Sequence, residues 1–398
     1  MNIKKFDFGI NNYLEDRPKL KKYLPQALTL FAIIFVLGYF TYNAQVNMGN
    51  RGIVFGFGFL TQESSFDIQF SLIDYDGSYS YGRAYLVGLL NTLLVAFIGI
   101  ILSTILGVIV GISRLSSNYL VSKFAETYVE IFRNIPLLLQ IFFWYFAALR
   151  ALPLPQDAIN LFDVTYLTVK GWFVPRFVWT NLSVFTGSLV LAIVAIIFTY
   201  IFAKKKQEAT GKRIPAFLIS LGLIIILPLL TFLIGGVKLD FEYPKLIQQS
   251  PTIFNFSGGV GIIPELIALA LALSLYTATF IAECVRAGIM GVGKGQKEAA
   301  ASIGLTPNQT LRLVVMPQAL RIIIPPTTNQ YLNLTKNSSL AAAIAYPDLV
   351  LVFAGTAMMQ TGRAIEIVSI TMLTYLTLSI LISIFMNWYN KKIAIKEK

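Results

Sequence analysis

The sequence contains no histidine and a single cysteine, Cys284. A chain with one cysteine cannot form an internal disulfide, and the usual ligands of a zinc or haem site are missing. Charged residues are also scarce, at 13% of the 398 residues, against about 25% in soluble domains. These shortages exclude most redox and metal chemistry, and they argue against a soluble globular protein.

Hydrophobic residues are abundant, at 56%, and the mean hydropathy is +0.68. Several apolar runs reach the roughly 20 residues that a helix needs to cross the hydrocarbon core, whereas a closed barrel would show short alternating segments. We therefore predict an all-α integral membrane protein with about eight transmembrane helices. The expected spans are 25–43, 86–112, 131–150, 181–203, 215–236, 263–285, 318–341 and 365–388.

The formal net charge of +12 has its origin outside these apolar runs. Basic residues cluster before the first span, between the fourth and fifth, and at the end of the chain: Lys4, Lys5, Arg17, Lys19, Lys21 and Lys22; Lys204, Lys205, Lys206, Lys212 and Arg213; Lys391, Lys392, Lys396 and Lys398. Because basic flanks favour the cytoplasmic side, we expect both termini inside. Segments 44–85, 151–180, 237–262 and 342–364 then face out. The charge reflects topology, and nucleic acid is not an expected partner.

Small residues recur every four positions in the second expected span, at Gly99, Ser103, Gly107 and Gly111. They share one helical face and allow another helix to approach closely. This pattern predicts an interior helix, and general membrane packing is sufficient to explain it.

A long polar segment follows the sixth expected span. Residues 296–303 are strong helix formers, and Gly304 suits the left-handed position that ends a helix. Thr306 can cap a second helix, with Pro307 at its first position and Gln309 completing a capping box. We therefore expect two short helices that meet at a fixed turn.

The first of these short helices carries Glu298 beside three alanines, Ala299, Ala300 and Ala301. Small side chains permit close backbone approach, so the helix is suited to lie in a groove of a partner. An ordinary cytoplasmic connector with good helix propensity is the alternative.

Several motifs favour the docking interpretation. Glu298-Ala299-Ala300, Gly304 six residues after Glu298, and Val314-Val-Met-Pro317 resemble the EAA loop of ABC-importer permeases, which in that family couples the membrane subunit to its ATPase. Two further stretches resemble polar amino acid permeases: Arg133-Asn-Ile-Pro136-Leu-Leu-Leu-Gln140 and Tyr276-Thr-Ala-Thr-Phe-Ile-Ala-Glu283-Cys-Val-Arg286-Ala-Gly288. Two stretches downstream resemble the longer, general L-amino acid branch of that family: Tyr331-Leu-Asn-Leu-Thr-Lys336-Asn-Ser-Ser-Leu340 and Tyr346-Pro-Asp348-Leu.

The resemblance implies a type I ABC importer permease core of five helices plus three additional helices. The expected divisions follow the chain in order. They are an N-terminal cytoplasmic segment, first span and periplasmic segment (1–84), the first part of the core (85–150), inserted periplasmic segments with two extra spans (151–260), the second part of the core with the EAA loop at 288–317 (261–390), and a cytoplasmic tail (391–398).

The resemblance also implies a function. The chain is expected to move L-amino acids from periplasm to cytoplasm by alternating access in a bacterial inner membrane. Its expected partners are two copies of an ABC ATPase subunit, a second permease subunit in a heterodimer, a periplasmic amino acid-binding protein and the lipid bilayer.

The chain itself is not expected to hydrolyse ATP. Gly288, Gly293 and Lys294 approach the spacing of a phosphate-binding loop, but Gly295 stands where Ser or Thr must hold magnesium, and a membrane helix precedes the segment instead of a strand. We therefore expect no catalytic residue, metal or cofactor in this chain, with ATP and Mg used by the partner ATPase.

Two groups of site residues follow. The expected ATPase-coupling residues are Gly295, Gln296, Glu298, Ala299, Ala300, Gly304 and Pro317. Polar groups at membrane depth are functional suspects because they are costly there, and the expected substrate-path residues are Asn329, Gln330, Lys336, Asn337, Ser338, Tyr276 and Glu283. Two alternatives stay open: Glu283 and Arg286, three residues apart, can form a structural ion pair, and Lys336 can pair with a helix-end carbonyl or a partner's carboxylate.

Two other classes of membrane protein are alternatives to an importer permease. A secondary amino acid transporter would carry ion-coupling carboxylates or histidines inside its spans and show inverted repeats. A membrane-embedded enzyme would need a nucleophile, metal cluster or acid–base pair at membrane depth, for which Glu283 with Arg286 is the one candidate. The sequence favours neither.

Overall fold

The computed structural model describes residues 18–50, 56–211, 214–234, 236–250 and 253–393. The chain divides into two compact units, one formed by residues 1–88 and 352–377 and the other by residues 89–351 and 378–398. Of the basic residues that set the expected topology, Lys4, Lys5, Arg17, Lys212, Arg213, Lys396 and Lys398 lie outside the described residues.

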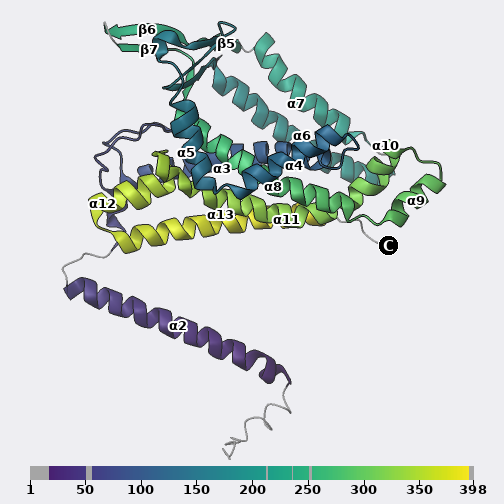
Figure 1. Cartoon of the computed structure of the whole chain (residues 1–398), viewed down its shortest axis with the longest axis horizontal. Coiled ribbons are helices and arrows are strands. Elements are labelled where there is room, and N and C mark those ends of the chain that lie inside the picture. The colour runs from purple at the N-terminus through teal and green to yellow at the C-terminus, as the bar shows by residue number, and fades with distance from the viewer. Residues whose placement is uncertain (1–17, 51–55, 212–213, 235, 251–252, 394–398) are drawn as a thin grey trace, which may run out of the picture. The chain divides into compact units, whose positions relative to one another are not determined.

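Helices dominate the described chain (Figure 1). The α-helices are α2 (Pro18–Asn50), α3 (Tyr81–Ser113), α4 (Tyr119–Asn134), α5 (Leu137–Phe142), α6 (Leu182–Thr210), α7 (Ala216–Leu233), α8 (Pro264–Met290), α9 (Lys294–Ser302), α10 (Pro307–Thr310), α11 (Met316–Asn337), α12 (Met358–Thr361) and α13 (Ala364–Ile393). Three π-helical segments, η2 (Phe143–Leu149), η4 (Leu311–Val315) and η6 (Val350–Ala357), and three 3-10 turns, η1 (Gly58–Thr61), η3 (Pro155–Asp157) and η5 (Ser338–Ile344), join them.

Six described helices are long and apolar enough to cross a membrane: α2, α3, α6, α7, α8 and α13. The bent pair of α4 with α5 and η2 makes a seventh if it counts as one span. The expected span at 318–341, the seventh along the chain, corresponds to α11, whose 22 residues are long enough to cross but are much less apolar. A polar helix of that length in a membrane protein requires partners other than lipid.

The expected span at 131–150 is not one continuous helix. The chain turns by 102° between α4 and α5, because the ring of Pro136 disfavours a helical conformation at Ile135, which is extended with ψ 126°. The side-chain amide of Gln140 donates hydrogen bonds to the carbonyl oxygens of Phe132 (2.7 Å) and Ile135 (2.9 Å). Gln140 therefore satisfies carbonyls that the end of α4 leaves unpaired.

Helix α8 is the most buried of the six long apolar helices, because 72% of its most apolar 18-residue stretch is buried inside the protein. The small-residue stripe of α3 lies against it. A methyl group placed on Gly107 would lie 2.6 Å from Cβ of Ile281, and one on Gly111 would lie 2.7 Å from the carbonyl oxygen of Ala282. The face of small residues is packed as predicted, against α8 at Gly107 and Gly111 and against Leu334 of α11 at Gly99. The prediction that α3 is an interior helix is wrong for the helix as a whole, since only 28% of its most apolar stretch is buried.

Eight short strands lie in segments for which the sequence provided no motif. Strands β1 (Ile159–Leu161), β2 (Thr165–Thr168), β3 (Gly171–Val174) and β8 (Val260–Ile262) form an antiparallel sheet in the order β1-β2-β3-β8. Strand β4 (Arg176–Thr180) pairs with β5 (Lys238–Glu242), and β6 (Lys245–Ser250) pairs with β7 (Ile253–Ser257), as two antiparallel ribbons. The two inserted segments that flank α6 and α7 therefore fold together.

In the first unit, residues 56–80 fold onto the chain around η6 and α13. The backbone N–H of Gly56 donates to the carboxylate of Glu366 (2.8 Å), which also pairs with Arg363 (3.7 Å). The ring of Phe59 stacks on Phe353 at 6.3 Å between centroids. These contacts tie residues 56–59 to the chain near Phe353 and Glu366.

Candidate coupling loop and transport path

The turn between α9 and α10 has the geometry that its residues predict. Gly304 follows α9 with φ +81°, a left-handed conformation that glycine adopts without strain. The hydroxyl of Thr306 accepts from the backbone N–H of Gln309 (3.4 Å), and the side-chain oxygen of Gln309 accepts from the N–H of Thr306 (2.9 Å). The predicted capping box with Pro307 at the first helical turn is confirmed.

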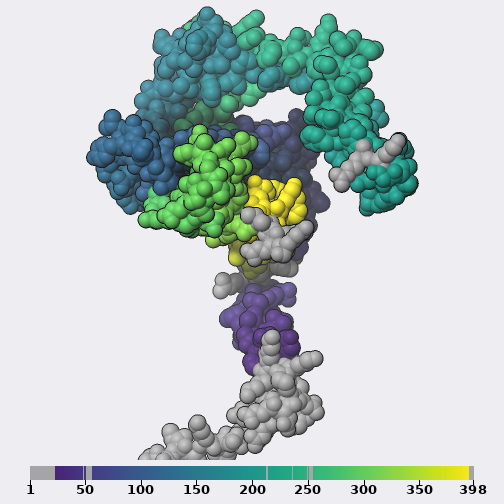
Figure 2. All heavy atoms as spheres, turned by 90° about the vertical axis from the view of Figure 1, so that its right-hand side faces the viewer, coloured from purple at the N-terminus to yellow at the C-terminus, as the bar shows by residue number. Residues whose placement is uncertain are grey.

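The two sides of α9 differ in exposure. Ala300 is 3% exposed and packs inward, whereas Glu298 and Ala299 are exposed. Just beyond the end of the helix, Ile303 is 76% exposed. In Figure 2, which looks from the α9 side, the green atoms of this part of the chain stand at the front. An acidic side chain, small residues and an exposed isoleucine together form a surface suited to a protein partner.

The loop is anchored to the membrane helices by an apolar cluster. Ile281, Val285 and Val292 pack with Val315, Ala319 and Ile323, and all six side chains are buried. A hydrogen bond of 3.4 Å also links the amides of Gln318 and Gln296. The base of the loop is therefore packed together with α8 and α11, and protein interiors are close-packed and deform little.

The remaining expected coupling residues lie at the ends of these elements. Pro317 is in the first turn of α11, directly after the π-helical segment η4. Gly295 is in the first turn of α9, and a methyl group placed on it would meet no atom within 4 Å. Within the described residues, no contact therefore requires glycine at position 295.

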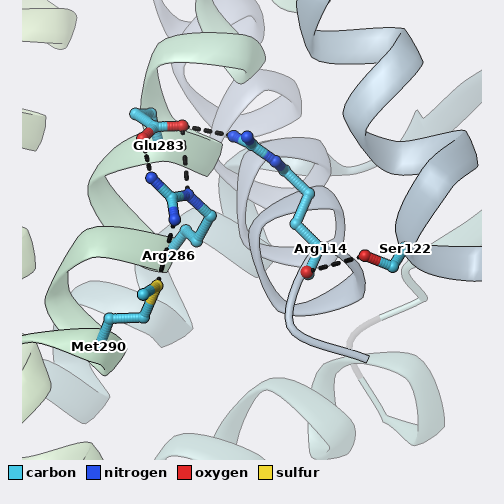
Figure 3. A network of polar contacts seen from close by, with 5 residues as sticks. All are labelled: Arg114, Ser122, Glu283, Arg286 and Met290. Carbon is cyan, nitrogen blue, oxygen red and sulfur yellow. Dashed lines mark hydrogen bonds and ion pairs between the residues drawn. The ribbon is translucent and has the colours of Figure 1, made fainter. Parts of the chain in front are cut away.

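A three-residue ion network ties α3 to α8 near the loop (Figure 3). Glu283 pairs with Arg114, at the C-terminal end of α3, and with Arg286 one turn further along α8 (2.5 Å). The carbonyl oxygen of Arg114 accepts from the hydroxyl of Ser122 on α4 (3.0 Å). Helices α3, α4 and α8 are therefore linked through Glu283 and Arg114. For Glu283 and Arg286 the structure shows the ion pair that the sequence left as one alternative.

A groove of about 950 Å³ lies between the α3–α4 connection and the loop. Leu115, Ser116 and Ser117 line one wall, and Lys297, Pro307 and Leu311 are among the residues of the other. The network of Glu283 adjoins this groove through Arg114, the residue before Leu115.

One face of α11 is exposed and polar, and the opposite face is buried. Asn329, Asn333 and Lys336 are exposed, and their spacing of four and three residues places them on one side of the helix. Leu334 and Thr335 are buried on the other side, at 0% and 1% exposure. Because polar groups are costly against lipid, this exposed polar face must meet protein or water in the assembled membrane protein.

Several expected path residues do not share that face. Gln330 and Asn337 are half-buried, and Ser338 is fully buried, with its hydroxyl donating to the carbonyl oxygen of Thr335 (2.7 Å). Tyr276, on α8, makes an edge-to-face contact with Phe280 at 5.0 Å. The structure thus places Asn329 and Lys336 together and the other candidates elsewhere.

Glu283 lies well away from Lys336. Gly288 of α8 packs against Ile323 of α11, and the two helices run antiparallel. At 1.5 Å per residue, Glu283 and Lys336 therefore differ by about 12 Å in depth. Glu283 therefore lies in the ion network with Arg114 and Arg286, and it does not share the polar face of α11.

Sequence reasoning missed three features of these sites. Arg114 follows an apolar span, which suggests topology, but its partner Glu283 is 169 residues away. Asn333 is not among the expected path residues, although it follows Asn329 by one helical turn. A buried network also joins Glu265 to the hydroxyl of Tyr145 (2.7 Å), which accepts from Arg150 (2.9 Å). Only the spacing of Asn333 offered a signal in the sequence.

Comparison with known proteins places the chain in a family. Residues 209–395 match the model described as "Binding-protein-dependent transport system inner membrane component". The chain is 48% identical to the general L-amino acid transport system permease protein AapQ of Rhizobium johnstonii over 382 residues, covering 96% of this chain and 94% of that protein. It is 41% identical to the glutamate/glutamine/aspartate/asparagine transport system permease protein BztB of Rhodobacter capsulatus over 405 residues, covering 94% and 93%.

Among solved structures, the crystal structure of an amino acid ABC transporter with histidines aligns with a TM-score of 0.46 and 19% identity, covering 78% of this chain and 95% of that one. The assignment itself comes from the two full-length relatives, since both are well above 30% identical and are covered almost end to end. The chain therefore belongs to the family of amino-acid ABC transporter permeases, as the EAA motif at Glu298 and the stretches that begin at Arg133, Tyr276 and Tyr331 predicted.

Proposed function

We propose that this chain is the membrane-spanning permease of an ABC importer that carries L-amino acids from periplasm to cytoplasm by alternating access. The observation that carries the proposal is the exposed polar face of α11, with Asn329, Asn333 and Lys336, in the same packed body as the loop that bears Glu298. A carrier needs both parts: a polar path and an element through which an outside energy source moves it.

The loop 288–317 is proposed to receive the ATPase. Its exposed residues Glu298, Ala299 and Ile303 supply the contact, and Gly304 sets the turn that presents them. Because the apolar cluster joins the loop to α8 and α11, movement of the ATPase would reorient both helices. ATP shifts the equilibrium between inward-open and outward-open states only by binding one of them better.

ATP and Mg are proposed to be used by the ATPase and not by this chain. In support, Gly288 lies within α8 against Ile323 and not in a phosphate-binding loop after a strand. Membership of the family implies ATPase and binding-protein partners in general. The finer arrangement proposed here is two ATPase copies, a second and related permease subunit, and a periplasmic amino acid-binding protein.

The chain's own surface supports the proposal of a second permease subunit. This chain has one EAA loop and can present it to one ATPase, so a pair of ATPases needs a second loop. The polar face of α11 also supports a second subunit, because Asn329 and Lys336 would otherwise face lipid. In the proposed orientation both termini and the loop are cytoplasmic, following the basic residues Lys204, Lys205 and Lys206.

Lys336 tests the path directly. Replacing Lys336 by methionine keeps the length of the side chain but removes the charge that attracts a substrate carboxylate. We expect binding-protein-dependent uptake into vesicles containing the whole complex to fall at least tenfold, the equivalent of about 1.4 kcal/mol. The matched control is Lys205→Met, which removes an exposed charge on α6.

Uptake is measured over a range of concentrations for acidic, neutral and basic amino acids. If Lys336→Met and Lys205→Met behave like the unmodified complex for every substrate, the path does not pass Lys336. If uptake of any substrate persists with no ATPase and no ATP present, the importer assignment fails and secondary transport must be considered again.

A further inference from the structure

The β4–β5 ribbon continues directly from the two inserted membrane helices. Strand β4 ends at Thr180 and α6 begins at Leu182, while α7 ends at Leu233 and β5 begins at Lys238 (Figure 1). Helices α6 and α7 present large apolar side chains outward along their length, including Phe198, Phe217 and Ile225, each more than half exposed. In a membrane protein such side chains face lipid.

The junction between ribbon and helices is held by several hydrogen bonds. The hydroxyl of Thr180 donates to the carbonyl oxygen of Lys238 (3.1 Å) and accepts from its N–H (3.0 Å). The amide of Asn181 donates to the carbonyl oxygen of Gly236 (3.3 Å). The rings of Trp179, Phe185 and Phe232 pack together, with centroids 4.8–6.0 Å apart. The ribbon is therefore fixed to the outer ends of α6 and α7.

The two faces of the ribbon differ in chemistry. Cross-strand pairing places Phe177 opposite Phe241 and Trp179 opposite Leu239, and alternation along a strand puts these four side chains on one face. Tyr243 follows Phe241 by two residues and stacks on it at 6.4 Å. The result is an aromatic stripe that runs from the Trp179 cluster to Phe177, Phe241 and Tyr243.

The opposite face is polar. It carries the pair Arg176 and Glu242 (3.6 Å), together with Asp240. These residues line a groove with Lys245, and Val178, Phe241 and Tyr243 also border it. Charges of both signs on this face suit contact with water.

The aromatic stripe is open in the described chain. Phe177, Phe241 and Tyr243 are 58%, 49% and 45% exposed. A two-stranded ribbon is marginally stable alone in water, and aromatic side chains with this exposure are typical of the boundary between lipid and water. The stripe is continuous, through Trp179, with the lipid-facing ends of α6 and α7.

We propose that the aromatic stripe of Phe177, Phe241 and Tyr243 binds the outer interface of the lipid bilayer, so that the inserted ribbon lies on the membrane beside α6 and α7. Its polar face, with Arg176, Asp240 and Glu242, then faces the periplasm. This contact anchors the outer end of the α6–α7 hairpin, and it does not depend on transport.

The single cysteine makes a direct test possible. In a Cys284→Ser background, single cysteines at Phe177 and Phe241 receive a nitroxide label, and Asp240 and Glu242 provide controls from the other face of the same ribbon. The labelled chain is assembled into the complete complex in phosphatidylethanolamine/phosphatidylglycerol vesicles. Collision rates with oxygen, which concentrates in lipid, and with a water-soluble nickel chelate are then compared.

We expect the oxygen-to-nickel ratio at positions 177 and 241 to exceed that at positions 240 and 242 several-fold. Tyr243→Cys replaces either aromatic position if the labelled complex fails to assemble. Equal and high access of nickel at all positions would overturn the proposal, because the ribbon would then stand in water. Protection at 241 that appears only after a binding protein is added would also overturn it and would assign the stripe to a protein partner.

Discussion

Replacing Glu283 by glutamine is expected to lower the thermal unfolding midpoint of the purified complex and to weaken the response of the ATPase to substrate. The change leaves the guanidinium groups of Arg114 and Arg286 facing each other without the carboxylate between them. Their side chains are 16% and 30% exposed, so water compensates only in part. The expected loss is on the order of 2 kcal/mol, somewhat below that for a fully buried pair.

The matched control for Glu283 is Glu126→Gln. Glu126 pairs with Lys123 (2.9 Å) on the exposed side of α4, with both side chains at least 40% exposed, and such pairs contribute under about 1 kcal/mol. The double change Arg114→Met with Glu283→Met should cost less than the sum of the two single changes, because it leaves one arginine instead of two. Additive effects, or a Glu283→Gln complex as stable as the Glu126→Gln complex, would show that the network does not join α3 to α8.

Replacing Gly111 by valine is expected to abolish accumulation of folded protein. The added carbon would lie 2.7 Å from the carbonyl oxygen of Ala282 and 2.8 Å from Cβ of Val285. A backbone oxygen cannot rotate away as a side chain can, so α3 and α8 must separate along their buried contact. Overpacking of this kind costs about 3 kcal/mol or more.

Gly187→Val is the control for this prediction. Gly187 also lies inside an apolar helix, α6, but a methyl group placed on it meets no atom within 4 Å. The two variants share the cost of placing valine in a helix and differ in the space available. Yield and monodispersity in detergent should stay near normal for Gly187→Val and collapse for Gly111→Val; equal behaviour would mean that α3 and α8 do not pack at Gly111.

Features that depend on a few neighbouring residues were predictable from the sequence. The capping box of Thr306 and Gln309, the left-handed Gly304 and the pairing of Glu283 with Arg286 each require fewer than seven consecutive residues. The close-packed face at Gly107 and Gly111 needed only the helical repeat. Local chemistry determines these features whatever the rest of the chain does.

Features that depend on distant partners were not predictable in this way. The bend at Ile135 could be suspected from Pro136, but Gln140, which stabilises it, reads as an ordinary polar residue in an apolar span. The strands at 176–180 and 238–242 pair across two membrane helices, and neither has a turn signal that connects them. Arg114 gains its role only when α3 and α8 are in contact.

The same distinction applies to the polar residues of α11. Their composition marked the segment 329–338 as unusual, but it did not separate Asn329 and Lys336, which are exposed, from Ser338, which bonds its own helix. Burial on α11 is decided by α8 and its other neighbours. Sequence alone therefore indicated the stretch, and the structure selected the face.

The most direct test of the central claim is ATP hydrolysis by the complete reconstituted complex, with and without an amino acid and its binding protein. The variant Glu298→Lys reverses the charge on the exposed side of α9, and Glu208→Lys makes the same change on α6. We expect substrate to stimulate hydrolysis in the unmodified and Glu208→Lys complexes. The Glu298→Lys complex should either keep its ATPase but lose this stimulation, or lose the ATPase during purification. Equal stimulation in all three complexes would contradict the assignment of residues 288–317 as the coupling loop.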